Sequence, residues 1–264
     1  MNKETILFKG AKYRALNGKS GVRWAYDRMA NDYDHSNYLL WTRRMEKGEE
    51  RIIKNWIGYF SIPTLDIGCG TGRYSIKIAE KGFEVVALDV SLGMLKKTRK
   101  KTRKKMLFGR VHPILADGEN LPFKSESFSS LICTLTFDHF QNDELAAQEF
   151  SRVLKKGGFL VISTVNSYTL SDFKRRYNLP PDKVPFRTES LSPVLIYEVG
   201  HSIDEIKELF KREFEIIDVK GCCYWHLLPL PLIIYYKTKF DFLFNIFKFL
   251  LKYAEIHVIL MKKR

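Results

Sequence analysis

The strongest chemical signal in this sequence is a glycine-rich run, LDIGCGTG, at residues 65–72. Gly68, Gly70 and Gly72 carry no Cβ atom, so backbone N–H groups in this turn can approach a ligand closely. The residues that follow have helical spacing, and a helix N-terminus favours a negative group. The run alone also fits a tight strand-to-helix connection that binds nothing, so its neighbours decide between the two interpretations.

Two aspartates favour a ligand. Asp89 ends the apolar run 85–88, about 20 residues after the first glycine, where an acidic residue accepts the ribose hydroxyls of a bound nucleoside. Asp117 follows a third apolar run at 111–116. Strands that end in the glycine-rich turn, Asp89 and Asp117 place polar groups at one edge of a parallel sheet, which is where this fold class binds ligands.

Apolar runs alternate with helical patterns along the chain, which predicts an α/β fold in a single domain. Strands are predicted at 62–67, 85–89, 111–116, 128–135, 159–164, 214–219 and 256–260. Helices are predicted within 22–57 and at 73–81, 91–105, 142–155, 202–212 and 240–253. Ser202 and Glu205 have the spacing of a capping box. Residues 1–22 are predicted to form a loose arm.

Four motifs in order and with matching spacing resemble class I S-adenosylmethionine-dependent methyltransferases: LDIGCGTG, VVALDVS, ILADGENLPF and EFSRVLKKGGFLVIST. The likeness is greatest to the type 11 branch, which includes the ubiquinone/menaquinone-biosynthesis C-methyltransferases, and covers residues 25–164 and 202–264. A dinucleotide-binding pattern fits less well, because it would need glycine where Arg73 stands. The resemblance implies a Rossmann-like, doubly wound, seven-stranded sheet, mostly parallel with an antiparallel last strand, plus helical cap elements.

The resemblance also implies S-adenosyl-L-methionine as cofactor, with S-adenosyl-L-homocysteine as its product. The implied cofactor contacts are a loop of Gly68, Cys69, Gly70 and Gly72 beneath the methionine part, Asp66 anchoring that loop, Asp89 on the ribose, Asp117 and Gly118 at the adenine, Val90 and Met94 on either side of the adenine ring, and Tyr33 closing over the methionine end. Tyr33 belongs to the run ANDYD at 30–34, and packing between helix and sheet is its alternative role.

In the resembled family, the loop after the fourth strand faces the transferring methyl group. That makes Asp138 and His139 candidates for orienting or deprotonating the acceptor. The alternative for His139 is a hydrogen-bonding residue at a strand end. Cys69, Cys133, Cys222 and Cys223 lack zinc-binding spacing, so no metal site is predicted, and they fit a reducing, cytoplasmic location.

The chain carries 44 Lys and Arg against 30 Asp and Glu, a net charge of +14. This excess fits an anionic partner such as RNA, an acidic membrane surface or an acidic metabolite, and it equally fits a solvated surface. The densest basic run, 96–105, has no aromatic residues to stack on bases. No transmembrane span is expected, because the uncharged run 221–236 is short and contains two prolines.

Two further segments are expected to cap the acceptor. Residues 165–201 hold four prolines and are predicted to form a lid or binding loop. Residues 221–253 include the widely apolar helix at 240–253, which must bury most of its circumference against the core, an apolar acceptor, a second copy of the chain or a membrane surface. Residues 1–60 form the arm and cap helices of this single domain, 61–164 its cofactor-binding core and 254–264 its last strand.

The predicted function is therefore methyl transfer from S-adenosylmethionine to a small-molecule acceptor, apolar or aromatic, by in-line displacement. An RNA methyltransferase, acting on tRNA or rRNA through the basic surface, is the alternative. A binding protein without catalysis is a third interpretation, and the intact glycine-rich turn, Asp89 and Asp117 argue against it.

Overall fold

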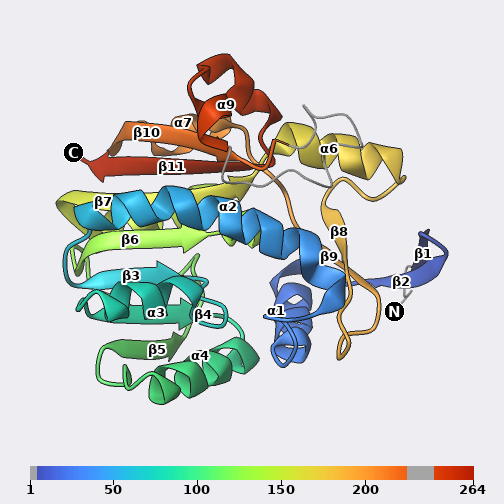
Figure 1. Ribbon diagram of the computed structural model, residues 1–264, viewed down its shortest axis with the longest axis horizontal. Coiled ribbons are helices and arrows are strands. Elements are labelled where there is room, and N and C mark those ends of the chain that lie inside the picture. Colours follow the sequence, from blue (N-terminus) through green and yellow to red (C-terminus); the bar gives the residue numbers. More distant parts are fainter. Residues whose placement is uncertain (1–4, 225–240) are drawn as a thin grey trace.

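The computed structural model describes residues 5–224 and 241–264 (Figure 1). Its centre is a seven-stranded sheet with the strand order β10-β11-β7-β6-β3-β4-β5. Its strands are β3 Thr64–Ile67, β4 Val85–Asp89, β5 Val111–Leu115, β6 Phe128–Thr134, β7 Leu154–Val165, β10 Phe214–Cys222 and β11 Ile256–Lys263. The five strands β5, β4, β3, β6 and β7 run parallel, and β11 lies antiparallel between β7 and β10. The predicted fold class is confirmed.

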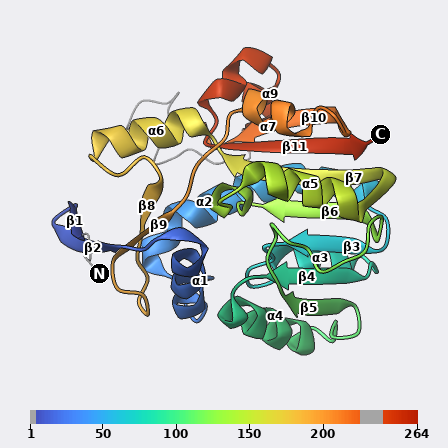
Figure 2. The ribbon, with the colours of Figure 1, turned by 180° about the vertical axis from the view of Figure 1, so that it is seen from behind.

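Helices cover both faces of this sheet. The helices are α2 Leu40–Trp56, α3 Arg73–Glu80 and α4 Leu92–Lys104 on one face, and α5 Asp143–Val153 and α7 Ile203–Phe210 on the other (Figures 1 and 2). The capping box at the start of α7 is confirmed, since the Ser202 and Glu205 side chains each accept the other's backbone N–H. The helix predicted at 142–155 ends earlier than expected, and β7 starts at Leu154, before the glycine pair.

A second, four-stranded sheet contradicts the prediction of a loose N-terminal arm. Its order is β1-β2-β9-β8, built from β1 Thr5–Phe8, β2 Ala11–Ala15, β9 Val194–Tyr197 and β8 Lys183–Phe186. The β1–β2 hairpin turns at Lys9 and Gly10, which both have positive φ (44° and 77°), as tight hairpin turns require. The predicted lid at 165–201 is thus ordered, with α6 Ser167–Arg176 preceding the two strands.

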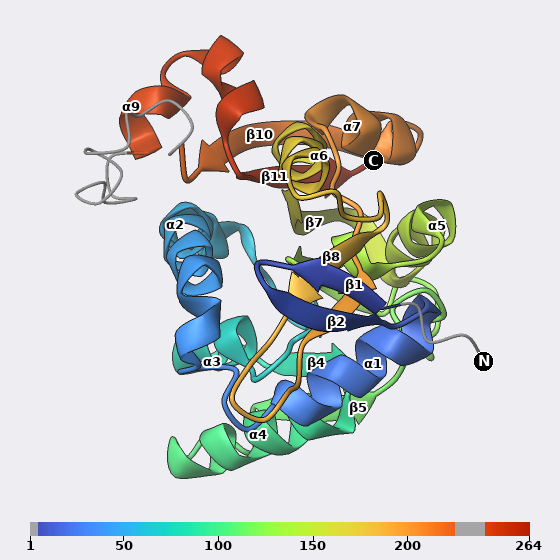
Figure 3. The same ribbon diagram turned by 90° about the vertical axis from the view of Figure 1, so that its right-hand side faces the viewer.

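This small sheet and α1 Gly18–Met29 lie beyond the carboxyl ends of the parallel strands (Figures 1 and 3). The Asp32 carboxylate fastens the cap, because it accepts hydrogen bonds from the backbone N–H (2.8 Å) and hydroxyl (2.5 Å) of Ser190, which precedes β9. The 3₁₀ helix Asn37–Leu39 then leads into α2, and another, Ile57–Tyr59, follows α2. The segments expected as an arm and an insert therefore form one layer over the sheet edge.

The helix predicted at 240–253 is wrong. Over the described residues 241–253, the chain forms the short α9 Asp241–Asn245 and the 3₁₀ helix Lys248–Tyr253. The apolar side chains that were expected to be buried are exposed instead: Phe242, Leu243, Ile246, Phe247 and Phe249. Among the residues described, no helix has the length and apolar character to cross a membrane.

Candidate functional site

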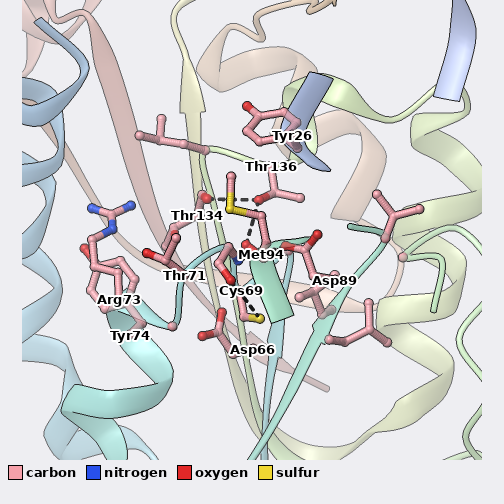
Figure 4. A pocket seen from close by; sticks show the side chains of 18 of the residues that line it. Tyr26, Asp66, Cys69, Thr71, Arg73, Tyr74, Asp89, Met94, Thr134 and Thr136 are labelled. Atoms are coloured by element: carbon pink, nitrogen blue, oxygen red, sulfur yellow. Dashed lines mark hydrogen bonds between the residues drawn. The ribbon is translucent and has the colours of Figure 1, made fainter. Parts of the chain in front are cut away.

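A cavity of about 420 Å³ opens at the carboxyl ends of β3, β4 and β6 (Figure 4). This edge is where the parallel strand order reverses, because the chain continues from β3 to β4 on one side and later returns to β6 on the other. The sequence-predicted cofactor residues all line it: Tyr33, Asp66, Gly68, Cys69, Gly70, Gly72, Asp89, Val90, Met94, Asp117 and Gly118. His139 lines it as well.

The glycine-rich turn has the backbone geometry that its sequence requires. Gly68, Gly70 and Gly72 have φ values of +68°, +54° and +86°, a region that other residues rarely adopt. A Cβ atom on Gly68 would also lie 2.1 Å from the Thr136 side chain. The Thr136 hydroxyl donates to the Gly68 carbonyl (3.2 Å), so the turn is held against the loop after β6.

Asp66 anchors the helix that follows this turn. Its carboxylate is 1% exposed and accepts hydrogen bonds from both the backbone N–H (2.9 Å) and the hydroxyl of Ser75 in α3. Burial raises the pKa of Asp66 to about 6, against the effect of these two hydrogen bonds. Burial also raises the pKa of the neighbouring Cys69 thiol well above its ordinary value, so this cysteine is a wall residue and no nucleophile.

Asp89 holds the turn from the next strand. One carboxylate oxygen accepts the Gly70 N–H (2.8 Å) and the other accepts the Ser91 N–H (2.8 Å). Burial raises the pKa of Asp89 to about 6, opposed by these two hydrogen bonds. Each oxygen has a second lone pair, so the ionised carboxylate can still accept two hydroxyls of a ligand.

The predicted adenine end of the cavity carries an unpredicted lysine. Lys19 of α1 forms ion pairs with Asp117 and with Glu119, the latter at 3.1 Å. Beside them, a Cβ atom on Gly118 would lie 2.6 Å from the Phe140 ring, so only glycine leaves this wall open. No local pattern predicts the role of Lys19, because its contact joins residues 98 positions apart.

The N-terminal segment is tied to the glycine-rich turn by Asp34 and to the start of α4 by Asp27. Asp34, the last residue of the ANDYD run, accepts the Thr71 hydroxyl (2.7 Å) and pairs with Lys101 (2.7 Å). In α1, Asp27 accepts hydrogen bonds from the Ser91 hydroxyl (2.7 Å) and the Gly93 N–H (2.8 Å) at the start of α4. The ANDYD motif predicted a role for Tyr33, whereas Asp34 and Asp27 make the hydrogen bonds that hold the N-terminal segment in place.

His139 faces the cavity together with Tyr26, which sequence reasoning missed. His139 Nδ1 lies 2.8 Å from the Tyr197 carbonyl oxygen, and its Nε2 lies 2.8 Å from the Tyr26 hydroxyl. Because a carbonyl only accepts, Nδ1 carries the proton, and Nε2 of the neutral ring accepts from Tyr26. Burial raises the pKa of Tyr26 well above its ordinary value, so its hydroxyl keeps its proton.

Asp138 differs from its predicted role, because it is absent from the cavity wall. Its side chain is 2% exposed and accepts hydrogen bonds from the Thr164 hydroxyl and the Val165 N–H (3.0 Å). It also lies 3.3 Å from His201 Nδ1. Asp138 therefore does not face the cavity. Its hydrogen bonds attach the loop that contains His139 to strand β7.

A buried ionic group lines the side opposite Asp89 (Figure 4). Arg73 pairs with the fully buried Glu49 of α2 at 2.6 Å, and Tyr33 points its hydroxyl toward Glu46 at 3.5 Å. Burial raises the pKa of Glu46, an effect that Arg73 opposes. This wall can bind polar and charged groups of a ligand.

The two segments expected to cap an apolar acceptor, 165–201 and the described part of 221–253, contribute no residue to the cavity wall.

Comparisons with known proteins agree with this geometry. The family model of a methyltransferase domain matches residues 65–162. The ubiquinone/menaquinone biosynthesis C-methyltransferase of Wigglesworthia glossinidia brevipalpis is 32% identical over 187 residues, which cover 67% of this chain and 72% of that protein. The chain therefore belongs to the S-adenosylmethionine-dependent methyltransferases, and S-adenosylmethionine is the cofactor of its family.

Two other similarities set the limits of that conclusion. The malonyl-[acyl-carrier protein] O-methyltransferase of Methylovorus sp. (strain MP688) is 32% identical over 161 residues, 59% of this chain. The chain spans about half, 53%, of that relative's length, so the relative's activity does not transfer directly. A crystal structure of a Pyrococcus horikoshii OT3 protein has a TM-score of 0.62 at 19% identity, covering 90% of this chain and 98% of that one, and supports the fold alone.

Proposed function

We propose that this chain transfers a methyl group from S-adenosylmethionine to a small-molecule acceptor. The observation that carries the proposal is the single cavity wall that joins the glycine-rich turn, Asp89, Asp117 and His139. The space beside Gly118, which a Cβ atom would fill, and the remaining lone pairs of the Asp89 carboxylate fit an adenosine group. When bound, the cofactor supplies the methyl group in activated form.

The residues of this chain would hold the cofactor by its parts. Asp89 would accept the ribose hydroxyls, and Asp117 with Gly118 would bound the adenine, which Val90 and Met94 enclose. The turn from Gly68 to Gly72 would lie beneath the methionine part, with Tyr33 and Arg73 around its polar end. Cap residues would exclude water, which favours transfer to the acceptor over hydrolysis.

Tyr26 and His139 would take the acceptor's proton. An acceptor hydroxyl that donates to the Tyr26 oxygen can pass its proton there while Tyr26 passes its own proton to His139 Nε2, 2.8 Å away. The Tyr197 carbonyl stabilises the resulting imidazolium through Nδ1–H. His139 then acts as general base through Tyr26, and Asp138 acts as a positioning residue for the loop.

The nature of the wall favours an aromatic acceptor with an ionisable hydroxyl. The rings of Tyr26 and Tyr33 lie 6.2 Å apart at an angle of 51° and provide an apolar surface beside the proton acceptor. A ring hydroxyl that loses its proton becomes a better nucleophile at oxygen and at the adjacent ring carbon. The quinone-biosynthesis name of one relative is consistent with this class.

The test measures cofactor binding and turnover separately. Purified protein is given methyl-labelled S-adenosylmethionine and a panel of phenols and hydroquinones, with aliphatic alcohols and amines as negative controls. Tyr26→Phe should reduce turnover of phenols by about 100-fold, the scale of general-base catalysis, while cofactor affinity stays unchanged. Tyr38→Phe, on a 50% exposed tyrosine that does not line the cavity, is the matched control. Equal turnover by Tyr26→Phe and wild type would refute the proton relay.

A second proposal concerns how an apolar acceptor reaches the enzyme. We propose that the exposed surface of Phe242, Leu243, Ile246, Phe247 and Phe249 contacts an anionic membrane surface. Lys248 and Lys252 lie in the same segment, and the chain carries +14 overall, so the charge complements acidic lipid. Apolar side chains flanked by lysines are typical of proteins that rest on a bilayer without crossing it.

Vesicle binding tests this surface. Wild type should sediment with vesicles of anionic lipid and not with vesicles of neutral lipid, and Phe242→Ser/Phe249→Ser should abolish sedimentation. Phe108→Ser, on a 69% exposed side chain elsewhere, is the control. Equal sedimentation of the double variant and wild type would contradict the proposal. Loss of a dimer in the double variant, without vesicle binding by wild type, would assign the surface to a second copy of the chain.

A further inference from the structure

Three metal-binding side chains converge outside the methyltransferase cavity. Cys222 lies at the end of β10, Cys223 follows it, and Asp241 opens α9. Both thiols are fully buried and the aspartate is 4% exposed. One ligand atom of each, two Sγ atoms and a carboxylate oxygen, lie within 4.8 Å of one another. Neither the cofactor nor the acceptor chemistry uses them.

The backbone brings the two thiols to the same side. Consecutive side chains of a strand point to opposite faces, so neighbouring cysteines in regular β structure diverge. Cys223 avoids this because its φ is +65°, in the left-handed region that residues other than glycine rarely adopt. Such conformations persist where the surrounding structure fixes them, and they cluster at functional sites.

The third ligand is held in place by the same turn. An Asp241 carboxylate oxygen accepts the Cys223 N–H at 3.1 Å, which fixes the carboxylate beside the thiols. The neighbouring helix α2 makes room through Gly48, where a Cβ atom would lie 3.0 Å from Cys222 Cβ and 3.2 Å from the Asp241 carboxylate. A glycine at this position lets α2 approach Cys222 and Asp241 closely.

Backbone oxygens of α2 complete the surroundings. The Cys222 thiol donates to the Met45 carbonyl oxygen (4.0 Å), and the Cys223 thiol donates to the Arg44 carbonyl oxygen (3.8 Å). Two sulfur donors and one carboxylate, with an oxygen donor near, match the tetrahedral preference of Zn²⁺ better than that of Mg²⁺ or Ca²⁺.

We propose that Cys222, Cys223 and Asp241 form a buried Zn²⁺ site that ties the start of α9 to the end of β10. The sequence does not predict this site, because two adjacent cysteines and an aspartate 18 residues later resemble no common zinc motif. The bound ion would link two points far apart in sequence and stabilise the packing of α9 on α2 and β10. The site is separate from methyl transfer and is testable without a substrate.

Binding has two signatures that a merely structural cysteine pair lacks. Cysteine binds Zn²⁺ as a thiolate, so binding through two cysteines releases protons. Reduced, metal-free protein titrated with Zn²⁺ in weak buffer should bind one ion per chain by elemental analysis and release about two protons. Co²⁺ as a probe should give thiolate charge-transfer absorption and the visible bands of a tetrahedral site.

Variants assign the ligands. Cys222→Ser and Asp241→Asn should each weaken Zn²⁺ binding by at least about tenfold and remove the rise in melting temperature that Zn²⁺ gives wild type. Cys133→Ser, which changes a buried cysteine in β6, should leave binding unchanged. Wild-type protein that binds no Zn²⁺, or gives no thiolate absorption with Co²⁺, overturns the proposal even where a variant fails to fold. Unaltered binding in folded Cys222→Ser overturns it as well.

Discussion

Replacing Asp89 by alanine should separate cofactor affinity from stability. The proposed ribose contact is a hydrogen bond to a charged group, which contributes about 1.5–3 kcal/mol, so its loss should raise Kd for S-adenosylmethionine about 10- to 100-fold. The variant also loses the hydrogen bonds to Gly70 and Ser91 N–H. The pKa of Asp89 is nevertheless raised from 3.8 to about 6, so at pH 7 the ionised carboxylate already opposes folding by about 3 kcal/mol.

The raised pKa of Asp89 also predicts how the stability of the protein changes with pH. Because the folded-state pKa lies above the unfolded value, the contribution of Asp89 to stability is greatest below pH 3.8 and is lost as pH rises through about 6. Asp89→Ala should therefore destabilise the protein less at pH 8 than at pH 5. Cofactor affinity should show the opposite trend in wild type, falling below pH 6 as the carboxylate is protonated.

Calorimetric titration with S-adenosylhomocysteine at pH 8 and pH 5, together with urea unfolding, measures both quantities. Asp204→Ala, which removes a 90% exposed carboxylate outside the cavity, is the control and should change Kd little. Unchanged affinity in Asp89→Ala at pH 8 would refute the ribose assignment. A loss of stability in Asp89→Ala that is as large at pH 8 as at pH 5 would refute the electrostatic reasoning.

Three further outcomes are expected. The pKa of His201 is raised from 6.5 to about 9, since hydrogen bonds to Asp138 and Asp143 outweigh the effect of burial. Its stabilisation, about 3 kcal/mol, is full below pH 6.5 and lost as pH rises through 9, so urea unfolding of His201→Gln should lose this pH dependence. Gly118→Ala should weaken cofactor binding by calorimetry, because its Cβ meets the Phe140 ring at 2.6 Å, and added Phe140→Leu should restore it. Transfer-RNA binding, measured by filter retention, should be absent, whereas tight binding that weakens steeply as salt rises would favour the RNA alternative.

The residues proposed to hold the cofactor could be predicted because their signals are local. A glycine-rich turn and carboxylates at strand ends are each set by a few neighbouring residues, and the topology of a parallel sheet brings them to one edge. The cofactor residues predicted in this way all line the cavity. The antiparallel place of the last strand followed from resemblance, and β11 occupies it.

The site residues that were not predicted depend on contacts between distant parts of the chain. Tyr26 meets His139 across 113 positions, and Lys19 meets Asp117 across 98, and neither pair has a local pattern. The β1–β2 hairpin was missed because Lys9-Gly10 is a weak turn signal in a polar segment. The helix predicted at 240–253 failed for a different reason, since helical spacing of apolar residues does not ensure that a surface exists to bury them.

Methyl transfer from labelled S-adenosylmethionine tests the central claim most directly. Purified protein is incubated with deproteinised cell extract, which is then separated into RNA, lipid and polar small-molecule fractions. The expected label is in a lipid or small-molecule fraction, it carries a phenolic or quinol ring, and it falls about 100-fold with Tyr26→Phe. Label confined to RNA and removed by nuclease, or tight cofactor binding with no labelled product in any fraction, would contradict a small-molecule methyltransferase.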